Sequence, residues 1–121
     1  MEHNSDFRYD LDFGVLGEAL VLDILTKKKV EVKTDRQTIQ GKGTGNIYIE
    51  YESRGKPSGI ATTQADYWAF VLSNNQIAIF ETEWLKKLAR KYLKNGSILG
   101  GDSNTSKCVL IPIKECWIKT P

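Results

Sequence analysis

The sequence predicts one domain of the mixed α/β (α+β) class, in which helices flank a mixed β-sheet. Apolar residues recur at helical spacing in two segments, about 13–25 and 83–93. Strand-forming residues gather in four other segments, at 30–35, 46–52, 76–80 and 107–113. Helical and extended segments alternate along the chain, which is typical of a sheet that helices cover.

The expected domain covers residues 10–121, after a polar tail at residues 1–9. A chain of 121 residues is long enough to bury one core. No apolar run approaches the roughly 20 residues that span a bilayer, and the first residues lack the order of a secretory signal. We therefore expect a cytoplasmic protein without membrane contact.

The elements follow from local signals. Asp12 is predicted to cap the first helix, which runs from about Phe13 to Leu25. A glycine-containing loop separates the first two strands, and Ser58-Gly59 ends a turn segment. The continuous apolar run 67–72 suggests a buried second helix over about 64–72. The predicted order is therefore α-β-β-α-β-α-β.

The two cysteines are expected to be buried thiols. Cys108 and Cys116 flank a predicted strand, and eight extended residues place them roughly 26 Å apart. A disulfide needs Cα atoms within about 7 Å. Because the one histidine, His3, lies in the tail, we expect any bound metal to be a hard cation held by carboxylates.

The strongest chemical signal is Glu31-Val32-Lys33 in the first strand. Residues two apart in a strand share a face, so Glu31, Lys33 and Asp35 point the same way. Carboxylates can hold Mg²⁺, and a nearby ammonium can orient water or steady a phosphate. An exposed ion pair between neighbours on a strand is the simpler interpretation, and these three residues alone do not decide between the two.

Two further carboxylates extend the pattern. Glu18 is centred on an apolar helix stripe, which predicts that it lies where the helix meets the sheet and has a lysine or metal partner. Glu50 lies on the second strand, with Glu52 on the same face. Pairing of the first two strands would place one of them beside Glu31. For Glu50 and Glu52, the alternative is that they lie on an exposed strand face.

Basic and polar residues near these strands predict contacts with a polyanion. The candidates on this side are Arg36, Lys42, Arg54, Lys56, Ser58 and Gln64. Ser58-Gly59 and the expected helix start at Thr62-Thr63 could bind a phosphate. A second basic stretch at 86–94 is interpreted as a solvated helix face.

The helical Gly17-Glu18 followed by Val30-Glu31-Val32-Lys33-Thr34 resembles the PD-(D/E)XK nuclease superfamily. The resemblance covers about residues 10–80 and implies a restriction-endonuclease-like fold, of a small phage-type or Holliday-junction-resolvase-like kind. It also implies that Glu18, Glu31 and Lys33 match the family's helix glutamate and E-x-K motif. Gln64 looks like the glutamine that some members carry.

One departure from the family pattern leaves alternatives open. Only twelve residues separate Glu18 from Glu31, which leaves no room for the strand that normally carries an aspartate. Asp35 or Glu50 could supply that ligand, and Glu50 is favoured. Alternatively, Glu31 takes the aspartate position and residues 50–52 form a degenerate E-x-E, or the site binds without cutting.

The resemblance therefore implies a Mg²⁺- or Mn²⁺-dependent endonuclease acting on DNA in a bacterial or phage-infected cell. Recognition of branched DNA structures is favoured over recognition of a long sequence. The metal ligands would be Glu18, Glu31, Glu50 and Asp35, with Lys33 as the catalytic lysine. A homodimer is expected because cutting both strands needs two sites. The alternative is a catalytically inactive nucleic-acid-binding or assembly module with the same fold.

Overall fold

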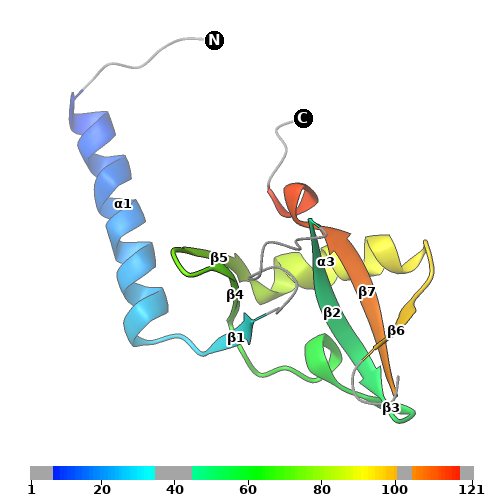
Figure 1. The fold of residues 1–121 in the computed structure, drawn as a ribbon. Coiled ribbons are helices and arrows are strands. Elements are labelled where there is room, and N and C mark those ends of the chain that lie inside the picture. The colour runs from blue at the N-terminus through cyan, green and yellow to red at the C-terminus, as the bar shows by residue number, and fades with distance from the viewer. Residues whose placement is uncertain (1–6, 35–44, 101–104, 118–121) are drawn as a thin grey trace.

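The structure, a computed structural model, describes residues 7–34, 45–100 and 105–117. Two sheets and two α-helices make up most of this part of the chain (Figure 1). It is thus a mixed α/β protein, as predicted, but it has two sheets where the sequence predicted one.

The first sheet has the strand order β1-β4-β5. Strand β1 (Val30–Thr34) is parallel to β4 (Tyr67–Ser73), which is antiparallel to β5 (Gln76–Glu81). The second helix predicted at 64–72 is therefore wrong, because most of this segment is β4. An apolar run of this length fits a central strand as well as a buried helix.

The second sheet is antiparallel, with the order β3-β2-β7-β6. It consists of β2 (Asn46–Ser53), β3 (Lys56–Pro57), β6 (Ile98–Gly100) and β7 (Ser106–Pro112). The predicted pairing of the first two strands is wrong, because β2 pairs with β3 and β7 while β1 pairs with β4. The strands predicted at 46–52, 76–80 and 107–113 are confirmed within a residue or so.

The core lies between the two sheets and the helix α3 (Thr82–Leu93), which packs against β5 and β7. Its most deeply buried large side chains include Trp68, Ile49, Leu85 and Ile111. The short helix η3 (Ile113–Cys116) is tied to α3, since Trp84 Nε1 donates to the Cys116 carbonyl at 2.7 Å. Both cysteines are buried and free, as predicted.

Helix α1 (Phe7–Thr26) extends away from the sheets (Figure 1). It begins at Phe7, so it includes the last three residues of the predicted tail and places Asp12 inside the helix rather than at its cap. None of its side chains from Asp12 to Thr26 is buried. No helix among the described residues is long and apolar enough to cross a membrane.

Candidate functional site

Glu31 and Lys33 share a face of β1, as the strand pattern predicted. Lys33 Nζ lies 3.1 Å from Glu31 Oε1, and each side chain is 45% exposed. The parallel register places Glu31 opposite Trp68, and the Lys33 ammonium lies 5.3 Å from the centroid of the Trp68 ring. This cation–π contact and the ion pair together fix the direction of the Lys33 side chain.

Glu31 lines a hollow of about 390 Å³ where β1 meets the segment that leads into β4. The residues that line it are Lys29, Val30, Glu31, Gly59, Thr62, Thr63, Gln64, Ala65 and Trp68. An ammonium, a carboxylate, an amide and two hydroxyls thus meet on one small surface. Such a mixture of donors and acceptors suits a polar or anionic ligand.

Hydrogen bonds to Asp66 hold the two sides of this hollow together. The Lys29 amide donates to Asp66 Oδ2 at 2.9 Å, and the Asp66 amide donates to the Lys29 carbonyl at 2.8 Å. These bonds begin the β1–β4 pairing, which joins residues 37 positions apart. Asp66 therefore sets the spacing between Glu31 and the 62–65 segment.

The indole of Trp68 is buried in the wall of this site, with 1% of the residue exposed. Its Nε1 has no hydrogen-bond partner within the described residues. A buried donor without a partner is uncommon and is often explained by a water or ligand. Sequence reasoning missed Trp68, because it placed this residue on a helix.

Glu50 lies in the other sheet. The prediction that strand pairing places it beside Glu31 is therefore wrong. Its Oε2 accepts a hydrogen bond from Ser58 Oγ at 2.9 Å. Gly59, which starts the short helix η1 (Gly59–Ala61), lies against the Glu50 main chain and also lines the hollow. Glu50 is therefore next to a residue of the hollow but is not among the residues that line it.

The remaining predicted ligands are not brought to this place. Glu18 is exposed on α1, and the prediction that it lies between helix and sheet is wrong because α1 does not pack on either sheet. Asp35, Arg36 and Lys42 lie outside the described residues. Within the described ranges, no three histidine, cysteine or acidic side chains form a group that could hold a metal.

The predicted phosphate contacts are partly rearranged. Gln64 lines the hollow, but there is no helix start at Thr62-Thr63, because η1 precedes these residues and β4 follows them. Arg54 and Lys56 are exposed at the β2–β3 hairpin. Ser58 is occupied by its bond to Glu50.

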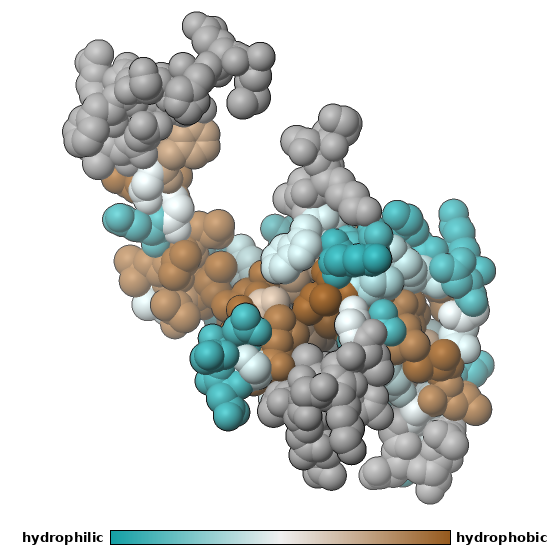
Figure 2. Space-filling model, turned by 45° about the horizontal axis from the view of Figure 1, so that its top comes forward, coloured by the Kyte–Doolittle hydropathy of each residue, from teal (hydrophilic) through white to brown (hydrophobic). Residues whose placement is uncertain are grey.

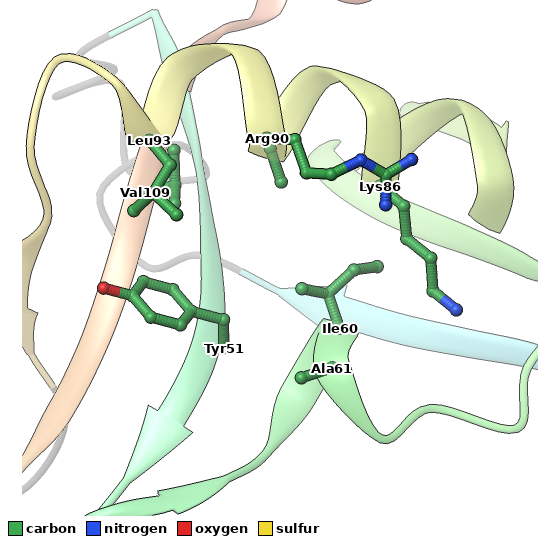
Figure 3. Close-up of a pocket in the computed structure, with 8 residues that line it drawn as sticks. Tyr51, Ile60, Ala61, Lys86, Arg90, Leu93 and Val109 are labelled. Atoms are coloured by element: carbon green, nitrogen blue, oxygen red, sulfur yellow. The ribbon is translucent and has the colours of Figure 1, made fainter.

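A second hollow, of about 300 Å³, is bordered by η1, α3, β2 and β7 (Figure 3). Ile60 and Val109 contribute apolar lining, and the ring of Tyr51 borders the hollow from β2. Lys86 and Arg90 project from α3 above it. The basic stretch at 86–94 is therefore not only a solvated face, since two of its members border a cavity.

The thiols are poorly suited to nucleophilic chemistry. Burial raises the pKa of the Cys108 thiol, and burial followed by the charge of Glu115 raises the pKa of Cys116 from 9.0 to about 11. Burial and a hydrogen bond with Cys108 likewise raise the pKa of Tyr48 from 10.0 to about 12. Because the thiolate is the reactive form of cysteine, a raised pKa makes both thiols poor nucleophiles near neutral pH.

The fold and the hollow define a mixed α/β protein with a small polar site, which contains both positively and negatively charged residues. Comparisons with protein-family models, with curated proteins and with solved structures found no match to the chain. The resemblance to PD-(D/E)XK nucleases therefore stays a prediction from the motif.

Proposed function

We propose that the protein binds the DNA backbone at the hollow beside Glu31 and acts there as a Mg²⁺- or Mn²⁺-dependent endonuclease. The observation that carries this proposal is that Glu31, which is ion-paired with Lys33, lines a cavity together with further polar residues. Cations and neutral donors can hold a phosphate, and a carboxylate among them distinguishes this site from a simple phosphate cradle.

The residues around the hollow would supply only some of the ligands of a divalent ion. Magnesium is often held by only one or two carboxylates, with water and substrate phosphate as its other ligands. Glu31 would be the protein ligand here, and Asp35, outside the described residues, remains a candidate for a second one. A bound ion would supply a Lewis acid and an activated water.

Lys33 and Lys29 would act on the phosphate. Lys33 is held by Glu31 and Trp68 at the site, so its ammonium can neutralise charge on the phosphate oxygens without a large rearrangement. Lys29 and Gln64, which also line the hollow, would orient the backbone. The hairpin cations Arg54 and Lys56 would add contacts to neighbouring phosphates.

A second candidate is a nucleic-acid-binding module without cleavage. Two features favour it: Glu31 is already paired with Lys33, and the described residues form no three-ligand metal group. Binding would then use the same cations and show the salt dependence of phosphate contacts.

Cleavage of supercoiled, linear, nicked and branched DNA, with and without Mg²⁺ or Mn²⁺, separates the two. Wild-type protein should cut only with metal, and Glu31→Gln and Lys33→Met should each lower the rate at least 100-fold, as expected when a transition-state contact is lost. Asp23→Asn and Lys107→Met are matched controls, because each removes one member of another exposed ion pair.

The result assigns the function. Metal-dependent cutting that survives both site substitutions would place the active site elsewhere. Salt-sensitive binding without cutting supports the module, and absence of both binding and cutting overturns both candidates.

A further inference from the structure

Helix α1 carries an unusually large exposed apolar surface. Its exposed large side chains are Phe13, Val15, Leu16, Leu20, Val21, Leu22 and Leu25, each between 53% and 72% exposed. In Figure 2 the hydrophobic surface gathers over this helix. A helix that is apolar on most sides is normally buried. The two glycines at 14 and 17 also lower its helix propensity, so packing must support it.

A second apolar surface is exposed on the outer face of the β1-β4-β5 sheet. Val32, Ala69 and Ile79 pair in one row across the three strands, and Val71 and Ile77 pair in the next. Val32, Ile77 and Ile79 are 60%, 64% and 42% exposed. The opposite face of the same sheet, with Trp68 and Phe80, forms the core. Parallel strand pairs, such as β1 and β4 here, normally occur in sheets that are covered on both faces.

The link between α1 and β1 keeps these two surfaces of one chain apart. The Lys27 and Lys28 amides both donate to the Asp23 carbonyl at the end of α1. The next residue, Lys29, is bonded in both directions to Asp66. A link of three residues that is tied at each end cannot turn α1 back over its own sheet without breaking these bonds.

We propose that α1 covers the outer face of this sheet in a second copy of the chain, reciprocally, in a twofold-symmetric dimer. The occupant of each apolar face is then the other copy's α1. This inference does not depend on the DNA chemistry proposed above, because no residue of the two apolar surfaces lines the hollow.

The exposed area agrees with this assignment. A large apolar side chain removes roughly 60–120 Å² from water when fully buried, so the ten exposed side chains on both surfaces supply on the order of 500 Å² per chain. Two chains would bury on the order of 1,000 Å² of apolar surface, close to the apolar share of a standard interface of about 1,600 Å².

A membrane surface is a poorer occupant. Interfacial helices are typically rich in lysine and arginine on their polar face. The polar positions of α1 are instead mainly acidic, including Asp12, Glu18 and Asp23, with no basic residue in the last turn. Anionic headgroups would repel these carboxylates.

Sedimentation velocity of the full chain tests the dimer. Wild type should sediment as a dimer at micromolar concentration, and Leu20→Glu or Ile77→Glu should each raise the dissociation constant at least tenfold. Leu99→Glu is the matched control, since Leu99 is 62% exposed on β6, in the other sheet. A wild-type monomer, or equal weakening by Leu99→Glu, would overturn the proposal.

Cross-linking tests which surfaces meet. A chain with Leu20→Cys is mixed with a chain carrying Ile77→Cys and treated with a short bismaleimide, to which the buried Cys108 and Cys116 respond slowly. The mixture should yield more cross-linked dimer than either chain alone. Stronger linkage between two Leu20→Cys chains, linkage within one chain carrying both cysteines, or binding of wild type to anionic vesicles would contradict the assignment.

Discussion

Gly59 lies directly against the main-chain carbonyl of Glu50. It has φ +55°, and a Cβ at this position would collide with the Glu50 carbonyl oxygen and carbon. The contact joins β2, which contains Glu50, to the short helix η1, whose first residue Gly59 lines the hollow beside β1. Glycine is therefore needed here for both its conformation and its size.

Gly59→Ala should destabilise the protein by about 2–4 kcal/mol, which combines the cost of a left-handed alanine with that of a backbone collision. Urea denaturation measures the loss. Gly55→Ala is the control, because Gly55 has φ +79° but nothing within 4 Å of a new Cβ; it should cost only about 1 kcal/mol. Equal losses for the two variants would show that the segment moves away from Glu50.

Arg54 is the one non-glycine residue with positive φ in the described part of the chain, at φ 52°. With Gly55 it forms the two-residue turn of the β2–β3 hairpin, which favours Asn-Gly. Arg54→Asn should therefore raise the free energy of unfolding by roughly 0.5–1 kcal/mol. Thermal unfolding measures this gain, and a destabilised variant would refute the strain argument.

The same substitution tests the DNA proposal. If Arg54 contacts a phosphate, Arg54→Asn should weaken binding and lower the slope of log affinity against log salt by about 1. Fluorescence anisotropy over a salt series gives both values. Gains in stability with unchanged affinity would remove Arg54 from the interface while leaving the turn argument intact.

The sequence predicted those elements that local chemistry determines. The amphipathic pattern of 83–93 and the strand patterns of 46–52 and 76–80 depend on near neighbours, and the structure confirms them. The helix prediction for 67–72 failed because a continuous apolar run has no periodicity that distinguishes a central strand from a buried helix. Its length and its polar flanks favoured a strand.

The site was predictable only along a single strand. That Glu31 and Lys33 share a face follows from strand geometry, and the structure confirms it. That Trp68 and Gln64 join them depends on the parallel pairing of β1 with β4, and no local signal encodes such a register. The predicted position of Glu18 was wrong for a similar reason. An apolar stripe indicates that a helix packs against a partner, but it does not indicate which partner.

Asp66 is predicted to stabilise the fold through the link between α1 and β1. Asp66→Ala removes the acceptor of the Lys29 amide and should cost about 1.5 kcal/mol, the lower end of the range for a hydrogen bond to a charged group, because this bond is exposed to solvent. Asp23→Ala is the control, because it removes only an exposed 3.7 Å ion pair at the C-terminal end of a helix, where a carboxylate is unfavourable. Urea denaturation should show little change for the control. An equal loss for both would mean that the Asp66 bond contributes nothing specific.

Stability should fall as the pH rises above about 9. In the folded protein the pKa of Cys116 is raised from 9.0 to about 11 and that of Tyr48 from 10.0 to about 12, in both cases first through burial. Between these values the unfolded chain has released protons that the folded chain retains, so the free energy of unfolding decreases with rising pH. The stabilisation is complete below pH 9 and is lost as the pH approaches 12.

Cys116→Ser should make the free energy of unfolding fall less with rising pH. The difference from wild type should be at most about 3 kcal/mol over the whole window. Removing Cys108 should also change the titration of Tyr48, its hydrogen-bond partner. Denaturant unfolding at a series of pH values measures the slope, and a flat profile from pH 8 to 11 in the wild type would show that the Cys116 thiol is not buried in solution.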